Sequence, residues 1–150
     1  MKNSLLSAIL VSILGILGCA CNDNSSAPSE VSVDKDIVVA IYSTSDKDGG
    51  VDTISPCLMK ETVHISELLH YPNDEGITMP FNLSDTIKWA EITESKLDKR
   101  IAISVNGEVL STPVVKMKLT NGACSVVLND AQMAAFFPDV NIKELQSTNN

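Results

Sequence analysis

The chain has 150 residues, which is enough for one domain and an additional segment. Its 44% hydrophobic and 20% charged residues are typical of a globular protein and exclude a disordered one, while the 4% aromatic content predicts a mainly aliphatic core. The formal charge of −8 argues against nucleic acid as a partner, because phosphate binding needs clustered Lys and Arg. It also argues against attachment to anionic lipid headgroups by charge.

Residues 1–18 have the pattern of a targeting segment. Lys2 precedes an apolar run from Leu5 to Leu17, which is too short to cross a bilayer comfortably as a helix and fits the hydrophobic part of a secretory signal. The end of this segment together with Cys19, Leu-Gly-Ile-Leu-Gly-Cys, resembles the lipobox of bacterial lipoproteins. That resemblance implies cleavage before Cys19, palmitate-type acyl chains on Cys19 and a firm membrane anchor. A plain signal peptide with an incidental cysteine is the alternative.

The residues after the lipobox predict a location and a tether. Ala20 rather than Asp follows Cys19, and by resemblance to proteobacterial lipoproteins this favours the outer membrane over the inner one. Residues 19–36 are mostly small, polar or charged and predict a flexible tether that holds a folded domain away from the bilayer. The domain would then face the periplasm or the cell surface.

The first part of the domain predicts three strands. Residues 37–42, 57–63 and 77–83 are rich in apolar and β-branched side chains. Between the first two lies a run of turn formers with three aspartates, whose Gly position and lack of a terminal Glu do not fit an EF-hand, so we expect a long hairpin loop. Residues 64–69 predict a helical turn or a loop.

A helix is predicted over residues 85–97. Ser84 lies where an N-cap would, and Asp85 suits the positive end of the helix dipole. One stripe of this helix can face a sheet, with Trp89 as a core anchor; the stripe contains Trp89, Ile92, Thr93, Lys96 and Leu97.

The stretch after the helix predicts a β-hairpin. Asn106-Gly107 suits a two-residue type I′ turn, which pairs Val105 with Glu108, Ser104 with Val109 and Ile103 with Leu110. One face would then be the core face, with Ile101, Ile103, Val105 and Leu110. The other face would be shallow, with Ala102, Ser104, Val109 and Ser111. We expect this small-residue face to contact polypeptide.

The remaining chain predicts two more strands and a short helix. Pro113 marks a strand end or an edge, and residues 115–119 then alternate apolar side chains with lysines, as a half-buried strand would. Residues 124–128 predict a further strand, after which Asn129 can cap a helix that stops before Pro138. The expected fold class is α+β: one antiparallel sheet with about two helices on one face, in a domain over residues 37–140 and a tail over 141–150.

Read together, residues 81–122 resemble the head region of the first periplasmic domain of SecD, a membrane subunit of the bacterial protein-export machinery. The resemblance is carried by Trp-Ala-Glu-Ile-Thr at the helix end, Lys99-Arg100, the Ile-Ala-Ile strand, Asn106-Gly107, the Ser-Thr-Pro-Val-Val break and Asn121-Gly122. Weaker likenesses at residues 57–69 and 128–136 extend it over most of residues 37–140.

The resemblance implies contact with extended or unfolded polypeptide and a link to protein export. SecD itself also has transmembrane helices and a base region, which this sequence replaces with a lipid, so coupling of a proton gradient to translocation is not expected. Strand addition at a sheet edge would supply such binding through backbone hydrogen bonds. The alternative is a structural or immunity-type envelope lipoprotein that binds one folded partner.

No catalytic constellation, metal site or cofactor motif is visible in the sequence. His64 and His70 lie six residues apart, which is not a zinc-helix spacing, and neither Gly-x-Ser-x-Gly nor a P-loop occurs. We therefore expect a protein that is not an enzyme. Cys57 and Cys124 could form a disulfide in an oxidising compartment, which would leave Cys21 unpaired; a Cys-His nucleophile is the competing interpretation.

Overall fold

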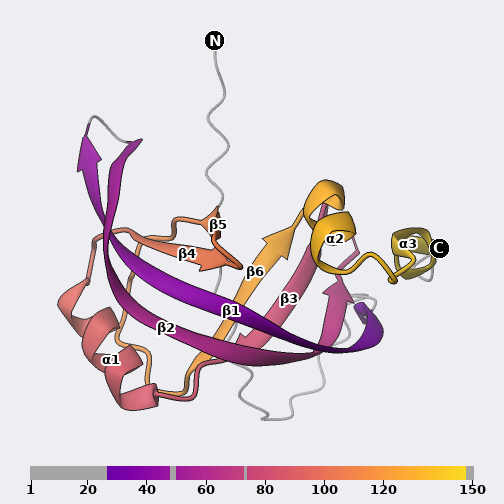
Figure 1. Cartoon of the computed structure of the whole chain (residues 1–150), viewed down its shortest axis with the longest axis horizontal. Helices are drawn as coiled ribbons and strands as arrows, with labels where there is room; N and C mark the ends of the chain where they lie inside the picture. The colour runs from indigo at the N-terminus through magenta and orange to yellow at the C-terminus, as the bar shows by residue number, and fades with distance from the viewer. Residues whose placement is uncertain (1–26, 48–49, 73, 148–150) are drawn as a thin grey trace, which may run out of the picture.

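The computed structural model describes residues 27–47, 50–72 and 74–147. Six strands form a single antiparallel sheet in the order β5-β4-β1-β2-β3-β6 (Figure 1). The strands are β1 (Ser29–Lys47), β2 (Gly50–His70), β3 (Ile77–Asn82), β4 (Ile101–Val105), β5 (Glu108–Ser111) and β6 (Ala123–Leu128). The helices are α1 (Thr86–Ser95), α2 (Asp130–Phe136) and α3 (Ile142–Ser147). The α+β class with one antiparallel sheet is therefore confirmed.

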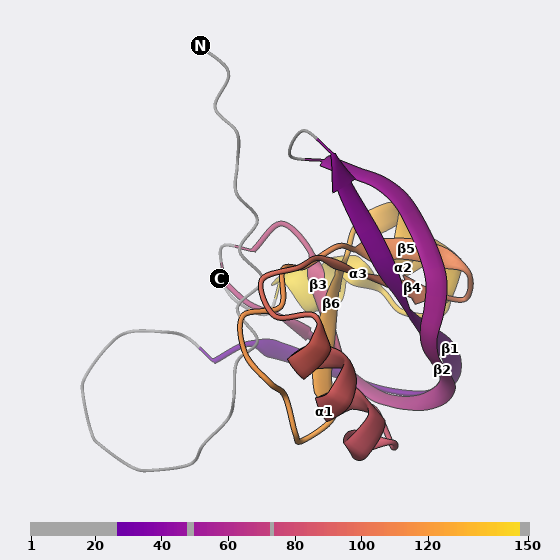
Figure 2. The same cartoon turned by 90° about the vertical axis from the view of Figure 1, so that its left-hand side faces the viewer.

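The long hairpin of β1 and β2 forms the centre of the sheet and curls strongly (Figure 2). Its pairing runs from Ser29–His70 to Lys47–Gly50, with several bulges along the way. Bulges bend a strand and increase its twist, so they allow such long strands to curve. The edge strands β5 and β6 are thereby brought close enough for some of their Cα atoms to lie within 8 Å.

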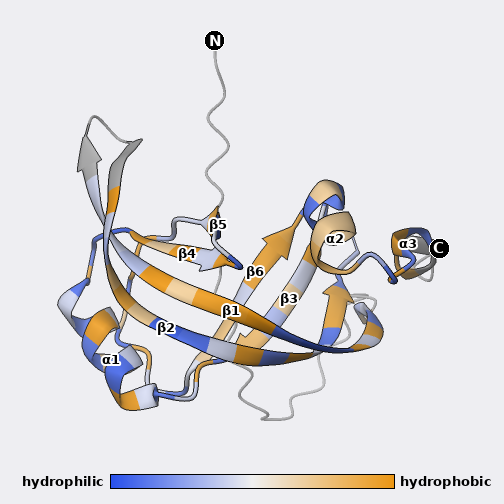
Figure 3. Ribbon diagram, in the orientation of Figure 1, coloured by the Kyte–Doolittle hydropathy of each residue, from blue (hydrophilic) through white to orange (hydrophobic). Residues whose placement is uncertain are grey.

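The hydrophobic core lies on the inner side of this curl. Alternate residues of β1, including Ile37, Val39 and Ile41, are at most 1% exposed. Helix α1 contributes Trp89 and helix α2 contributes Met133 to the same core cluster. Figure 3 shows the corresponding concentration of hydrophobic residues in the middle of β1 and along β6. Both helices thus pack against one apolar layer, as a sheet with one buried face requires.

The folded part is longer at both ends than the sequence predicted. Residues 29–36 belong to β1 and are not a tether, because Val31 and Val33 pack against the core and Lys35 donates a hydrogen bond to the carbonyl of Phe136. Every second residue of this segment is polar and faces solvent. The segment therefore has the polar composition of a linker although it forms a strand. Beyond residue 140, α3 buries Leu145 to 5% exposure. The remaining tether residues 19–26 lie outside the described residues.

Two further predictions of secondary structure are wrong. Residues 64–69 continue β2, since they pair with residues 30–36 of β1, which were not expected to form a strand. Residues 115–119 form no strand, because their backbone groups bind elsewhere: the N–H of Val115 donates to the carbonyl of Lys99, and the N–H of Leu119 donates to Oγ1 of Thr93. This segment therefore crosses from the hairpin to α1 instead of joining the sheet.

Helix caps largely follow the sequence. Oδ1 of Asn129 accepts from the N–H of Gln132, and Oε1 of Gln132 accepts from the N–H of Asn129. These two hydrogen bonds form a capping box. The N-cap of α1 is Asp85 and not Ser84, because Asp85 accepts from the N–H of Lys88 at 3.0 Å. Ser84 instead donates from its N–H and its hydroxyl to the carboxylate of Glu61 on β2.

Candidate functional site

The hairpin predicted as a contact surface has the expected turn but a different register. Asn106 and Gly107 both have positive φ, of 49° and 90°, as a type I′ turn requires. Val105 pairs with Glu108 and Ser104 with Val109, but Ile103 pairs with Ser111 because Leu110 forms a bulge. The bulge moves Ser111 to the inner face, next to Ile103.

The four residues predicted to share a polypeptide-contact face therefore do not share one. Ser104 and Val109 pair with each other on the outer face, whereas Ser111 faces inward. Ala102 is 0% exposed and Ser104 is 2% exposed, so only Val109, at 39%, is an exposed apolar side chain. The small side chains of Ala102 and Ser104 lie below their neighbours on the sheet surface and offer little contact area.

The two described cysteines are free thiols, so the predicted disulfide is wrong. Cys57 lies opposite Tyr42 near the start of β2, while Cys124 lies on β6 opposite Phe81. Strand β3 lies between β2 and β6 and pairs with β2 only at Leu69, far along the strand from Cys57. A disulfide needs Cα atoms within about 7 Å, and this topology keeps the two apart.

Burial and the nearby negative charge of Glu61 raise the pKa of the Cys124 thiol to about 12. A thiol with this pKa stays protonated at neutral pH, and only the thiolate is a good nucleophile. Cys124 is therefore a poor candidate for a catalytic nucleophile. His64 is exposed and its Nδ1 lies 3.0 Å from Oδ1 of Asp36, its cross-strand partner, whereas His70 is buried.

The described residues contain no group of three or more His, Cys, Asp or Glu side chains that could hold a metal ion. Of the three aspartates in the turn-rich run, Asp46 lies in β1 and Asp52 in β2, and Asp48 lies outside the described residues. No helix in the described part of the chain is long and apolar enough to cross a membrane. Cys19 also lies outside the described residues.

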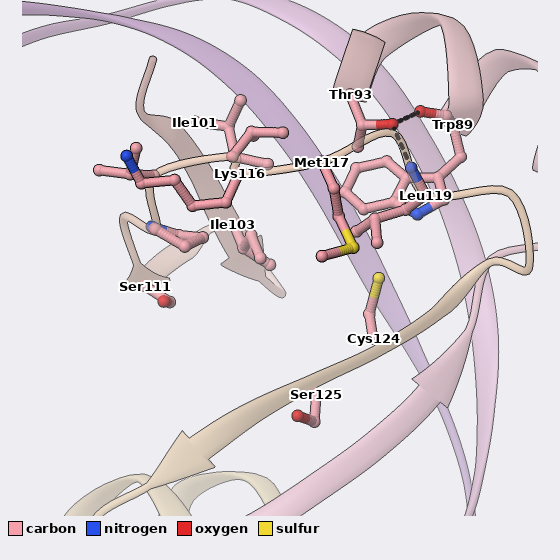
Figure 4. A pocket seen from close by; sticks show the side chains of 13 residues that line it. Trp89, Thr93, Ile101, Ile103, Ser111, Lys116, Met117, Leu119, Cys124 and Ser125 are labelled. Atoms are coloured by element: carbon pink, nitrogen blue, oxygen red, sulfur yellow. Dashed lines mark hydrogen bonds between the residues drawn. The ribbon is translucent and has the colours of Figure 1, made fainter. Parts of the chain in front are cut away.

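An apolar pocket of about 330 Å³ lies on the inner side of the curled sheet, where β4 and β5 face β6. Its size is near the lower end of the ~300–1,000 Å³ range of small-molecule sites. Figure 4 shows the side chain of Met117 beside the indole of Trp89 and Sγ of Cys124 directed toward that side of the pocket, with Ile101 and Ile103 on the opposite wall. The lining residues are Trp89, Thr93, Ile101, Ile103, Ser111, Pro113, Val114, Val115, Lys116, Met117, Leu119, Cys124 and Ser125.

The segment that follows the hairpin forms one wall of the pocket and is held at both ends. At its start, the carbonyl of Pro113 accepts from the N–H of Ile101, and Val115 exchanges hydrogen bonds with the residues before β4. At its end, Lys118 forms an ion pair with Glu94, next to the Leu119 bond to Thr93. Met117 lies between these attachments and is 53% exposed, so its side chain can move without release of the backbone.

Two buried polar atoms of the pocket wall have no hydrogen-bond partner among the described residues: Nε1 of Trp89 and Oγ of Ser111. Each has less than 1 Å² exposed. An unsatisfied buried donor costs about 1–3 kcal/mol, and such groups are rare in native proteins. The pocket thus combines apolar walls with neutral hydrogen-bonding groups. Its one charged lining residue, Lys116, has its ammonium 3.0 Å from Asp98.

The pocket opens between two sheet edges that have no further strand partner among the described residues, those of β5 and β6. A side-chain hydrogen bond from Gln132 to Glu108 joins the start of β5 to the chain just beyond β6. Figure 1 shows that the beginning of β6 lies away from β5. The part of the β6 edge beside the pocket is formed by Cys124 and Ser125, which line it.

Residue patterns identified only part of this site. Trp89 was expected as a core anchor, and it also forms a pocket wall; Met117 was assigned to a strand that does not exist. Pro113 is the signal that could have revealed this wall. Proline interrupts strand pairing, and here it follows a short strand, which indicates that the next segment leaves the sheet. Neither a protein-family model, nor a curated protein, nor a solved structure matches this chain.

Proposed function

We propose that this protein is a lipid-anchored, non-catalytic binding protein of the bacterial cell envelope that holds extended polypeptide along the edge of β6. The observation that carries the proposal is the combination of an unpaired sheet edge and an apolar pocket at the same place. A free edge offers backbone hydrogen bonds to any extended chain, and a neighbouring pocket adds affinity through side chains.

The register of β6 supports this use of its edge. Ser125 lies opposite Pro80 of β3, and proline has no N–H to donate. Pro80 therefore suits a pair without hydrogen bonds, in which the N–H and C=O of Ser125 point away from β3. The same alternation turns the backbone groups of Ala123 and Val127 to the free edge. Because the N–H of Ala123 donates to Oδ1 of Asn121 at 3.2 Å, the donors offered to an added strand are those of Ser125 and Val127.

The sequence supports the location and a role near protein export. The lipobox-like residues before Cys19 favour an anchored lipoprotein, with the outer membrane preferred by Ala20. The resemblance of residues 81–122 to the SecD head favours unfolded polypeptide as the partner. The anchor at Cys19 is tested by Cys19→Ser, which should release the protein from the membrane fraction; retention would contradict it.

Polypeptide binding is tested with the full chain in detergent and a reduced, alkylated protein that stays unfolded. Hydrogen exchange at the amides of Ser125 and Val127 should slow on binding, while the amides of β1 and that of Ala123, which donates to Asn121, stay unchanged. As a control, a peptide N-methylated at every residue has no backbone N–H to donate and should bind much more weakly than its unmethylated form. Absence of binding, or equal binding by the methylated and unmethylated peptides, would contradict strand addition.

A further inference from the structure

The pocket beside β6 has a size and chemistry that select one kind of side chain, and this inference rests on the proposed function. Its walls are aliphatic, aromatic or neutral polar, and the ammonium of Lys116 is paired outside with Asp98. A carboxylate or ammonium placed here would lose its hydration without gaining an opposite charge. An apolar side chain would be transferred from water to an apolar environment, which is favourable.

Strand addition along β6 brings a ligand side chain to this position. Side chains of successive strand residues point to opposite faces of a sheet, so every second residue of an added strand faces inward. The side chains of Cys124 and Val126 face inward, and that of Ser125 between them faces outward. If Ser125 pairs with the ligand through its backbone, the ligand residues on either side of that pair lie opposite Cys124 and Val126 and point inward, and the one opposite Cys124 lies at the pocket. The volume of about 330 Å³ fits one large side chain together with its backbone.

The indole N–H of Trp89, which has no hydrogen-bond acceptor among the described residues, indicates that the ligand also supplies an acceptor. Nε1 of Trp89 is a donor only, and nothing among the described residues accepts from it. Trp89 is 2% exposed, so a ligand reaches Nε1 only if a covering side chain moves. Met117 lies beside the indole in Figure 4, is unbranched and is half exposed, which makes it the neighbouring side chain best able to move.

We propose that the pocket accepts one large apolar side chain, aliphatic or aromatic, from a polypeptide strand added to β6. Entry of this side chain displaces Met117, and a carbonyl oxygen of the bound polypeptide accepts a hydrogen bond from Nε1 of Trp89. The pocket thus gives the protein a preference for apolar stretches, which are exposed in unfolded chains and buried in folded ones. Acidic segments are disfavoured further by the formal charge of −8.

The test uses the full chain in detergent and a set of unstructured host peptides that differ only in one central residue: Leu, Phe, Gly, Asp or Lys. Binding is measured by anisotropy of a dye on the peptide. The Leu and Phe peptides should bind about tenfold to a hundredfold more tightly than the Gly peptide, and the Asp peptide should bind most weakly. Trp89 is the only tryptophan, so its emission should also change with the Leu and Phe peptides.

Variants on β5 and in the pocket wall separate the pocket from the edge. Ser111→Leu fills the pocket and should abolish the preference for Leu and Phe. Val109→Leu, two residues earlier on the outer face, should preserve it. If Ser111→Leu fails to fold, Met117→Ala supplies the test, because removal of the covering side chain should strengthen binding of the Phe peptide.

The outcomes distinguish this inference from the proposed function. If all peptides bind with the same affinity, or if Ser111→Leu and Val109→Leu behave alike, the pocket does not select side chains, and strand addition at β6 stands alone. If no peptide binds, both proposals are wrong. An unchanged Trp89 emission during tight binding would also overturn the inference, since the ligand would then not reach the indole.

Discussion

The centre of the sheet and its edges are built in different ways. β1 and β2 have 19 and 21 residues and supply many side chains of the buried core, whereas β5 has four residues, contains a bulge and ends at a proline-containing segment. Unsatisfied buried polar atoms occur in both regions: Oγ of Ser29 lies at the start of β1, and Nε1 of Trp89 and Oγ of Ser111 lie in the pocket beside the edges. The comparison teaches that the long hairpin determines stability, while the less complete packing at the edges leaves room for a ligand.

The largest expected effect comes from the centre. Ile41→Ala removes a side chain that is 0% exposed and should lower the free energy of unfolding by about 2–5 kcal/mol. The matched edge variant, Val127→Ala, truncates a side chain that is 50% exposed. It should change the free energy of unfolding by no more than about 0.5 kcal/mol. Urea unfolding of both variants measures the difference. Equal effects would show that the edges are as tightly packed as the centre.

Two glycines with positive φ among the described residues, Gly107 and Gly122, give the second contrast. A Cβ at Gly122 would lie 2.4 Å from the carbonyl oxygen of Leu83, whereas a Cβ at Gly107 would meet no atom within 4 Å. Gly107→Ala should cost about 1–2 kcal/mol from the left-handed backbone alone. Gly122→Ala should cost more in the same thermal or urea measurement, because the backbone beside β6 must also shift. A smaller loss for Gly122→Ala would contradict this.

Alkaline pH tests the burial of Cys124. Its pKa is about 12 in the folded state and 9.0 for an ordinary thiol, so the unfolded chain loses this proton first. The resulting stability is fully present below pH 9 and is lost as the pH rises toward 12, by at most about 1.4 kcal/mol per pH unit. Cys124→Ala should remove that part of the pH dependence. The exposed Cys57 should be alkylated much faster than Cys124 at pH 8; similar rates would refute the burial.

The smallest effect is expected at the exposed contact between His64 and Asp36 at the centre of the sheet. The side chains of His64 and Asp36 are 55% and 70% exposed, and exposed pairs contribute about 0–1 kcal/mol. His64→Gln should therefore leave the unfolding midpoint nearly unchanged and should not alter peptide binding. A clear loss of either in calorimetry or anisotropy would give His64 a role that the structure does not explain.

Local sequence signals predicted local structure well. Asn106-Gly107 predicted the turn and its first two cross-strand pairs, and Asn129 predicted the cap of α2, because each depends on a few adjacent backbone groups. The alternation at Ile101 and Ile103 predicted their burial. The fold class followed from the same patterns.

The rest depended on contacts between distant residues. Residues 29–36 are largely polar and form a strand because they pair with β2. Residues 115–119 alternate as a strand would, but they form none because Lys99 and Thr93 accept hydrogen bonds from their backbone. The bulge at Leu110 places Ser111 on the inner face of the sheet instead of the predicted outer face. Ser111 therefore lines the pocket. The pocket itself arises from the curl of the whole sheet, and no short sequence pattern specifies that curl.

The bulge at Leu110 has a consequence for how copies of the protein avoid one another. An open sheet edge invites pairing with the same edge of another molecule, and irregular, short strands prevent this. With its extra residue, β5 presents no straight row of donors and acceptors, so two copies cannot extend one continuous sheet through it. Unwanted self-association is thereby limited on one side of the opening, and the edge of β6 stays available for a different chain.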